Sequence, residues 1–248
     1  MLKKNKTLTK KNKHLLQSNH TKNELLAIVA HDLRTPMYTL KTLHEELIET
    51  FSKGYLQKLQ NQLTGGLSIT SNTYHFVNNL LHWALAQNDQ FFYTLESIHL
   101  KSIIDQVTYN FDAATRFKNL TLINTIPKEI FVKADLNTLK IIFHNLIDNG
   151  IKYSHTMGTI DIAALINKTS NTCELTIKDH GVGMDQETIQ TILSSDKVVK
   201  GTHNKKNSTG LGLQLCKKLL VKNNAQLTIE SKKNQGTIIK IHLPIYTN

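Results

Sequence analysis

Apolar residues recur every three or four positions through two long stretches near the start of the chain, a spacing that draws one stripe along an α-helix. In residues 23–50 the stripe comprises Leu26, Val29, Leu33, Leu40, Leu43 and Leu47. In the stretch that ends at residue 87 it comprises Leu56, Leu63, Leu67, Thr70, Tyr74, Val77, Leu81 and Ala84. Residues 51–54 interrupt the pattern. We therefore predict an antiparallel helical hairpin, and burial of both stripes favours a dimeric four-helix bundle.

Beyond a linker at residues 88–97, which has lost this periodicity, the pattern becomes mixed. Helices are predicted at 101–117, 135–153 and near 212–223, with Asp135 as an N-cap. Strand-like runs occur at 120–126, 130–135, 159–166, 173–179, 226–231 and 237–244. The order of these runs predicts an α+β sandwich over residues 98–248, with helices on one face of a mixed, mostly antiparallel sheet.

Charge is concentrated at the start of the chain. Residues 1–22 contain seven lysines and no acid, and without them the net charge of +11 falls to +4. Such a leader fits a solvated helix, a segment beside a membrane or a nucleic-acid arm. The last is disfavoured because the segment has no aromatic residue to stack on bases. We expect no nucleic-acid partner, and a membrane connection only through an upstream segment.

The sequence shows neither a membrane-spanning stretch nor a cysteine spacing typical of a metal site. No stretch of the sequence is apolar enough to span a bilayer. The two cysteines, Cys173 and Cys216, stand at no metal-binding spacing, so we expect free thiols in the cytoplasm.

The segment "HDLRTP", residues 31–36, carries the first candidate chemistry. His31 lies two residues after Val29, so on a helix it points roughly 200° away from the apolar stripe. Thr35, four residues on, shares its face. The histidine could be a solvated surface residue or a metal ligand, although no partner ligand stands at the right spacing. It could also be a nucleophile whose tautomer Asp32 fixes, which would require a phosphoryl donor elsewhere in the chain.

Three polar residues of the helix that starts at Asp135 share one face: Asn145, Asn149 and Lys152. Amide oxygens suit Mg²⁺ and an ammonium suits phosphate. An ordinary solvent-exposed helix face would show the same polar residues, so this alternative stays open.

Two glycine pairs follow. Gly181 and Gly183 come directly after Asp179 at the end of a strand, where the backbone must approach something closely and the carboxylate could accept from a purine amino group. Gly210 and Gly212 precede a helix and could let a loop close over phosphates. Neither pair fits the Walker or Rossmann spacing.

Together these segments resemble the sensor histidine kinases of two-component systems. "LLAIVAHDLRTPM" looks like their phosphoacceptor box, "NLIDNGIKYS" like the N box, "DHGVGM" like the G1 box and "TGLGLQLCKKLL" like the G2 box. The order and the strand and helix contexts match over residues 23–244. The resemblance implies an ATP-binding domain of the Bergerat type, shared with gyrase, Hsp90 and MutL.

The resemblance also implies roles for the phosphoacceptor box. His31 would take the γ-phosphoryl group of ATP, Asp32 would polarise its ring and Arg34 would neutralise the transferring phosphate. Thr35 matches the position that orients water when related kinases dephosphorylate their partner. That partner would be the receiver domain of a response regulator, and the kinase would be a homodimer.

The implied ATP site draws on the remaining boxes. Asn149 would coordinate Mg²⁺, supported by Asn145, while Lys152 would reach the phosphates and Tyr153 would pack by the adenine. Asp179 would bind the adenine amino group, and Gly181 and Gly183 would admit the base. Gly210 and Gly212 would let the lid close, and Thr237 would support the adenine site.

Some residues depart from the family pattern. Asp32 replaces the commoner glutamate, Ser208 stands where the lid usually begins with glycine, and "TILSSDKVVKG" lacks the usual paired phenylalanines. The altered lid leaves a non-catalytic scaffold open as an alternative to an active kinase, and Thr35 leaves a net phosphatase open.

Overall fold

The computed structural model describes residues 33–87, 93–194 and 211–246. The chain divides into two compact units, Met1–His82 and Trp83–Asn248, and each has its own packing. The leader at 1–22 and the start of the first predicted helix, including His31 and Asp32, lie outside the described residues. So do residues 88–92 of the linker and the stretch 195–210 that holds Ser208 and Gly210.

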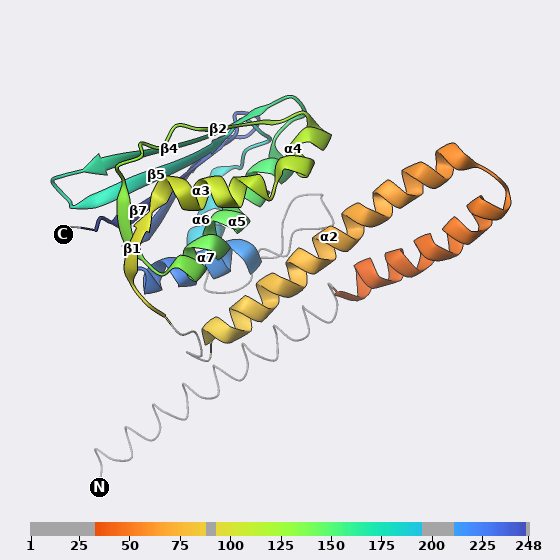
Figure 1. Cartoon of the computed structure of the whole chain (residues 1–248), viewed down its shortest axis with the longest axis horizontal. Coiled ribbons are helices and arrows are strands. Elements are labelled where there is room, and N and C mark those ends of the chain that lie inside the picture. Colours follow the sequence, from red (N-terminus) through yellow and green to blue (C-terminus); the bar gives the residue numbers. More distant parts are fainter. Residues whose placement is uncertain (1–32, 88–92, 195–210, 247–248) are drawn as a thin grey trace, which may run out of the picture. The chain divides into compact units, whose positions relative to one another are not determined.

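In its described part, the first unit consists of two helices joined by a tight turn, as the apolar pattern predicted (Figure 1). The first helix is described over residues 33–52, and α2 spans Leu56–Gln87. Gly54 joins them with a positive φ of 69°. The Gly54 amide donates to the Phe51 carbonyl (3.0 Å) and the Tyr55 amide to the Thr50 carbonyl (3.3 Å), which is the Schellman arrangement that ends a helix at glycine.

Close packing between the two helices occurs at Gly66. A Cβ built there would lie 2.7 Å from Cδ2 of Leu43, so the absent side chain makes room for the first helix. Gln62 donates to Glu46 across the same contact (3.1 Å). The half-buried positions of α2 around these contacts are Leu59, Gln62, Gly66, Ile69, Thr73, Phe76 and Leu80.

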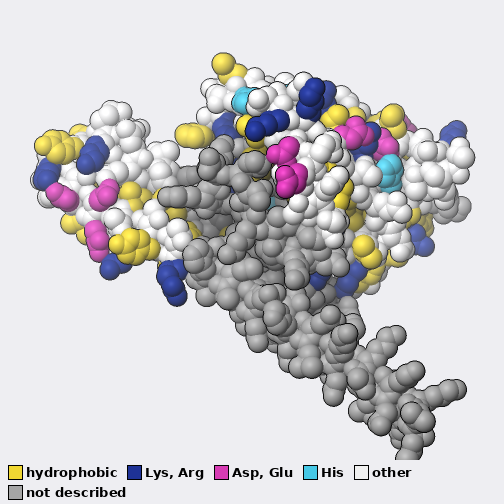
Figure 2. All heavy atoms as spheres, turned by 180° about the vertical axis from the view of Figure 1, so that it is seen from behind, with side chains coloured by type: hydrophobic (Ala, Val, Ile, Leu, Met, Phe, Trp, Pro, Cys, Tyr) yellow, Lys and Arg dark blue, Asp and Glu magenta, His cyan; other side chains and the backbone are white. Residues whose placement is uncertain are grey.

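The apolar stripe that the sequence assigned to α2 lies on a different face. Leu56, Leu63, Leu67, Tyr74, Val77 and Leu81 are all exposed within this chain, with Leu67 70% exposed. This stripe is about 100° around the helix from the residues that pack on the first helix. Figure 2 shows hydrophobic side chains on the surface of the hairpin, at the left of the view. The hairpin therefore buries one heptad face of α2 and leaves a second one open.

The second unit contains seven strands and five helices within its described part. The helices are α3 (Leu100–Tyr109), α4 (Asp112–Lys118), α5 (Leu136–Tyr153), α6 (Gln186–Ser194) and α7 (Leu211–Lys222). The strands are β1 (Glu96–His99), β2 (Thr121–Asn124), β3 (Phe131–Ala134), β4 (Thr159–Asn167), β5 (Thr172–Asp179), β6 (Gln226–Ser231) and β7 (Thr237–Pro244).

Five strands form the main sheet in the order β2-β4-β5-β7-β6, and β1 pairs with β3 in a separate two-stranded sheet. Only β2 and β4 pair in parallel; the other neighbours in the main sheet are antiparallel. Burial alternates along β5 and β7, so one face carries Leu175, Ile177, Ile239 and Ile241 into the core. Helices α3, α5 and α7 cover that face (Figure 1). The predicted α+β sandwich with a mixed sheet is confirmed.

One predicted helix is wrong in detail. The run at 101–117 is two helices, α3 and α4, separated at Asn110 and Phe111. Phe111 is buried and its ring packs on His144 of α5, with centroids 4.7 Å apart. At this break the Asn110 and Phe111 amides donate to the carbonyls of Val107 and Thr108, three residues back, and α4 begins after Phe111. Helix α6 and strand β1 had no counterpart in the prediction.

Candidate functional site

Helix α5 places the N-box residues. The Asp135 side chain caps it by accepting from the Thr138 amide (2.8 Å), as the sequence predicted. Its apolar face, which includes the fully buried Leu139 and Phe143, fixes how the helix rotates against the sheet. Asp135 also accepts from the Thr94 amide through its other oxygen (3.0 Å), which joins the start of this unit to the beginning of α5.

Asn145, Asn149 and Lys152 follow one another along α5, as their spacing required. Asn145 is 6% exposed, and its amide nitrogen donates to the Ile141 carbonyl one turn back (2.8 Å). Asn149 is half-buried, and its side-chain amide has no hydrogen-bond partner among the described residues. Lys152 is half-buried too, with its ammonium 6.0 Å from the centre of the Tyr153 ring. A buried amide, an available amide and a cation thus stand along one helix.

Asp179 ends β5 and is 8% exposed. Its Oδ1 accepts from the Gly181 amide (2.9 Å) and from the Thr237 amide (3.3 Å). Both of these bonds go to Oδ1, so neither of them occupies Oδ2. Burial raises the pKa of this carboxyl above its ordinary range, although the two amide donors act in the opposite direction.

Backbone contacts explain the glycines around Asp179. A Cβ on Gly181 would lie 2.1 Å from the Tyr153 carbonyl oxygen, and one on Gly183 would lie 2.0 Å from the Lys232 carbonyl oxygen. Gly183 also has a positive φ of 61°. Gly181 forms an antiparallel bridge with Ser154 directly after α5. The end of the N-box helix and the loop after Asp179 are therefore in direct contact.

Two residues of this corner were missed by the sequence analysis. Ser231 ends β6, and its hydroxyl oxygen accepts from the Met184 amide (2.8 Å) and lies 2.9 Å from Oγ1 of Thr237. Gly236 has a φ of 86°, and a Cβ there would lie 2.0 Å from the Asp179 carbonyl oxygen. The glycine before a strand was a visible signal of a tight turn, whereas nothing in the local sequence singles out Ser231.

The other predicted residues are placed as follows. Arg34 and Thr35 are exposed on the first helix, where the Thr35 carbonyl accepts from the Thr39 hydroxyl (3.0 Å). Gly212 lies in the first turn of α7. His31, Asp32 and Gly210 lie outside the described residues. The structure thus brings together Tyr153, Asp179, Gly181 and Thr237.

The described residues offer little other chemistry. They contain no group of three or more histidine, cysteine, aspartate or glutamate side chains placed to hold a metal ion. Both cysteines are buried and free, and burial raises the pKa of the Cys173 thiol to about 11. Among the helices described, none has the length and apolar character needed to cross a membrane.

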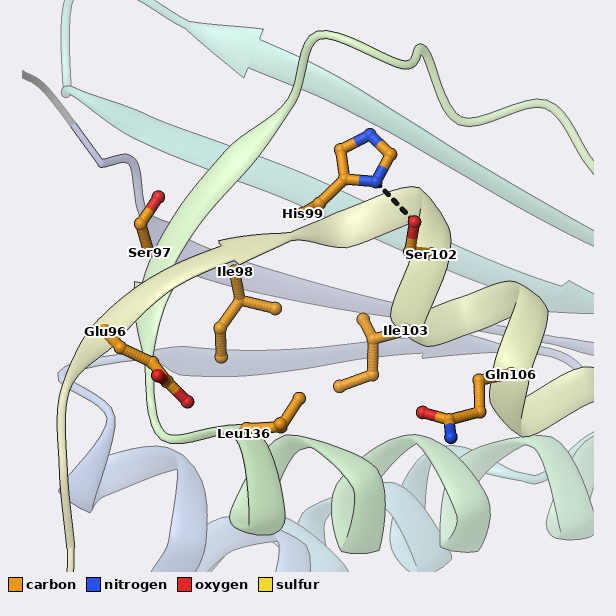
Figure 3. Close-up of a pocket in the computed structure, with 8 residues that line it drawn as sticks. All are labelled: Glu96, Ser97, Ile98, His99, Ser102, Ile103, Gln106 and Leu136. Carbon is orange, nitrogen blue, oxygen red and sulfur yellow. Dashed lines mark hydrogen bonds between the residues drawn. The ribbon is translucent and has the colours of Figure 1, made fainter.

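An open pocket of about 270 Å³ lies elsewhere in the second unit, against β1 and the start of α3 (Figure 3). Its apolar wall comes from Ile98, Ile103 and Leu136. His99 stands at its edge, with Nδ1 2.6 Å from the Ser102 hydroxyl and Nε2 2.6 Å from the Lys128 carbonyl. None of the predicted nucleotide-binding residues lines this pocket.

Comparison with known proteins defines the class of the second unit. Residues 134–247 match the family described as histidine kinase-, DNA gyrase B-, and HSP90-like ATPase. Among solved structures, Acinetobacter baumannii histidine kinase AdeS aligns with a TM-score of 0.63 at 21% identity, over 88% of this chain and 98% of AdeS. Full-length ShkA in complex with AMPPNP aligns with a TM-score of 0.60 at 19% identity, over 91% of this chain and 46% of ShkA. These likenesses support the fold described above.

Relatives in sequence extend the match to the hairpin. The adaptive-response sensory kinase SasA of a Synechocystis species is 28% identical over 247 residues, which are 96% of this chain and 63% of SasA. The sensor protein kinase WalK of Staphylococcus haemolyticus is 29% identical over 234 residues, which are 92% of this chain and 37% of WalK. The chain thus spans less than two thirds of these relatives. It is similar to these sensor histidine kinases along most of its own length, and its residues 134–247 match the ATPase family.

Proposed function

We propose that this chain is an ATP-dependent protein-histidine kinase that phosphorylates His31 and passes the phosphoryl group to an aspartate of a response regulator. The corner around Asp179 carries the proposal. A buried carboxylate held through one oxygen by the Gly181 and Thr237 amides keeps its other oxygen for the amino group of adenine. The phosphoacceptor box "HDLRTP" supplies a nucleophile in the same chain.

Nucleotide binding divides between two ends of the site. At the adenine end, Asp179 accepts from the base, and Tyr153 and Thr237 flank it. Gly181 and Gly183 let the loop after Asp179 pack against the carbonyls of Tyr153 and Lys232. At the phosphate end, Lys152 supplies positive charge and Asn145 supports the polar surface of α5. Gly210 and Gly212 give the lid the backbone freedom to close over the phosphates.

Magnesium fits the donors at the phosphate end. The half-buried Asn149 amide makes no bond with the described residues and can give its oxygen to the cation. Mg²⁺ in kinases takes few protein ligands and completes its shell with phosphate oxygens and water, so a single amide is an adequate protein contribution. When bound, the metal would neutralise phosphate charge during transfer.

The transfer itself needs positioning rather than further covalent chemistry from the ATP domain. A ring nitrogen of His31 forms a bond to the γ-phosphorus as the bond from that phosphorus to the ADP oxygen breaks. Asp32 accepts from the other ring N–H and stabilises the positive ring, while Arg34 lies exposed one turn along to offset the charge of the phosphoryl group. The regulator's aspartate then takes the phosphoryl group as the phosphorus–nitrogen bond breaks.

A phosphatase activity toward the regulator is a second proposal, which the exposure of Thr35 on the first helix supports. From that face its hydroxyl can orient water toward a phosphorylated partner. Replacement of Thr35 by alanine is then expected to slow decay of the phosphorylated regulator, whereas unchanged decay would rule the role out.

We also propose that the kinase works as a homodimer. The exposed stripe of α2 repeats with heptad spacing, from Leu63 and Leu67 through Tyr74 and Val77. A second hairpin packed on this stripe would complete a four-helix bundle. We place the protein in the cytoplasm, because its thiols are free and its proposed partner and nucleotide are intracellular.

Incubation of the full chain with radiolabelled Mg-ATP tests the kinase. We expect phosphate that is labile to acid and stable to alkali, and we expect none in His31→Gln, although that variant should still bind ATP. Label in His31→Gln equal to wild type would refute the assignment of the nucleophile. A wild-type chain that binds no nucleotide at millimolar Mg-ATP would instead favour the non-catalytic scaffold.

A further inference from the structure

The carboxyl end of α5 has an unusual set of hydrogen-bond partners. A helix leaves its last four carbonyls without intrahelical partners, and here these belong to residues 150–153. The Gly150 carbonyl accepts from the Ser154 amide (3.0 Å) and the Tyr153 carbonyl from the Val182 amide (3.1 Å). The two between them receive a side chain from outside the helix, the ammonium of Lys118.

Lys118 Nζ donates to the carbonyl of Ile151 at 2.7 Å and to that of Lys152 at 2.9 Å. It also lies 3.4 Å from the Ser154 carbonyl, just beyond the helix. An ammonium with several donors matches a helix end, where unpaired carbonyls concentrate partial negative charge. These contacts are partly buried, so water replaces them poorly.

The backbone of Lys118 is fixed independently of these contacts. It is the last residue of α4, and Asn119 follows in the left-handed region with a φ of 53°. The Leu120 amide donates to the Thr115 carbonyl (2.8 Å), and the Lys118 carbonyl accepts from the Met157 amide (3.2 Å). The ammonium therefore extends from a fixed point and is suited to hold its target in place.

The target is the element that positions the adenine end of the site. Lys152 and Tyr153 belong to the last turn of α5, which Lys118 contacts, and Ser154 forms its bridge with Gly181. Gly181 in turn donates to Oδ1 of Asp179. A continuous path of direct contacts runs from the Lys118 ammonium to the carboxylate that is proposed to recognise the base.

We propose that Lys118 is a positioning residue for nucleotide binding: by holding the last turn of α5 it sets the distance between that turn and Asp179. The inference rests on the proposed ATP site. Because the path leads to Asp179 at the adenine end, loss of Lys118 should weaken the binding of both ATP and ADP. A lysine that acted by general attraction of phosphate would affect ATP more than ADP.

Calorimetric titration of the full chain with Mg-ATP and Mg-ADP tests this. Lys118→Met keeps the apolar stem and removes every donor, and we expect both dissociation constants to rise by about tenfold, the equivalent of one ordinary hydrogen bond. Phosphorylation of His31 at saturating ATP should stay within about twofold of wild type, since bound nucleotide restores the corner. Lys118→Arg keeps charge and donors and should restore most of the affinity.

The matched control is Lys168→Met, which removes the same charge from an exposed position in the turn between β4 and β5. It should leave both dissociation constants unchanged. If Lys118→Met does not fold, Lys118→Gln, which keeps one donor group, is expected to show a smaller rise in the dissociation constants of both nucleotides.

Unchanged affinity in a folded Lys118 variant, an effect on ATP alone, or an equal effect in Lys168→Met would each overturn the inference. In those cases wild type still binds ATP and the proposed function stands. A wild-type chain that binds no nucleotide would instead overturn the proposed function and this inference with it.

Discussion

At the scale of single residues, Asp179 is the proposed acceptor for adenine, and its two carboxylate oxygens differ. Its Oδ1 accepts from two amide donors, so we expect Oδ2 to be the oxygen that contacts a ligand. Ionised, Oδ2 is an acceptor and suits an amino group. Burial favours the neutral acid and raises the pKa of Asp179. The ionised form, which is needed to accept from adenine, therefore lowers the stability of the fold.

Replacement of Asp179 by asparagine should lower the affinity for ATP without lowering the free energy of unfolding. The amide oxygen can still accept from Gly181 and Thr237, but an NH₂ group then stands where Oδ2 was and faces the adenine amino group donor to donor. We expect ATP affinity to fall by about a hundredfold, or about 2.7 kcal/mol, as measured by titration. The free energy of unfolding at neutral pH should not decrease, because a buried charge has been removed.

The control for this variant is Asp112→Asn, which removes an equal charge from an exposed pair with Arg116 on α4. It should leave ATP affinity unchanged. If Asp179→Asn bound ATP as tightly as wild type, Asp179 would not be the adenine acceptor.

The raised pKa of Asp179 also predicts a dependence on pH. In the unliganded protein the folded state holds the proton more tightly than the unfolded chain, whose carboxyl titrates near the ordinary value of 3.8. Asp179 therefore contributes stability below that value, and the contribution is lost as pH rises through the raised pKa. ATP affinity should change in the opposite direction and weaken as pH falls through the raised pKa. Titrations over acidic pH would measure this, and Asp179→Asn should abolish the dependence.

Sequence reasoning proposed Asp179, Gly181 and Gly183 because an acid and two glycines after an alternating strand leave a local signature. It could not find Lys118 or Ser231. The partners of Lys118 lie more than thirty residues away, and those of Ser231 include Met184. A lysine at a helix end and a serine at a strand end are unremarkable until the fold shows what they touch.

At the scale of elements, a buried asparagine joins α5 and α7. Asn223 is fully buried, and its oxygen accepts from the Asp135 amide (2.8 Å). Its nitrogen donates to the Thr138 hydroxyl (2.9 Å) and to the Leu219 carbonyl (2.8 Å). Both helices that carry nucleotide motifs are thus fixed to each other at the end of α7 and the start of α5.

Asn223→Ala should therefore destabilise the second unit. Loss of three buried hydrogen bonds is expected to lower the free energy of unfolding by about 3 kcal/mol, measured by urea denaturation. Gln190→Ala, an exposed change on α6, should stay within about 0.5 kcal/mol of wild type. A loss below about 1 kcal/mol in Asn223→Ala would mean that the two helices are held by apolar packing alone.

Elements with a strong period were predicted well, including the hairpin of α2 with the first helix and the antiparallel pairs β4–β5 and β6–β7. The misses have physical causes. Val107 and Phe111 are four residues apart and both buried, so the helical period continues across the break between α3 and α4 and could not reveal it. The parallel pairing of β2 with β4 joins strands separated by α5, and strand β1 is four residues long and partly polar.

At the scale of the whole molecule, the open heptad face of α2 predicts the state of assembly. Leu67→Glu places a charge in the middle of the exposed stripe, where Leu67 is 70% exposed in the single chain. It should leave the hairpin folded and convert a dimer into a monomer, as measured by sedimentation equilibrium. Asn61→Glu puts the same charge on a different face of α2 and should remain dimeric. A Leu67→Glu protein as dimeric as wild type would show that this stripe is not the interface.

The position of β7 has a consequence for how the protein is made. It follows β6 along the chain, yet it lies between β5 and β6 in the sheet. During translation these two strands therefore remain without their shared neighbour until residues 237–244 have left the ribosome. Thr237, the first residue of β7, also completes the hydrogen bonds of Asp179. We infer that a nascent chain which has already produced its histidine box, N box and both glycine boxes still cannot recognise adenine.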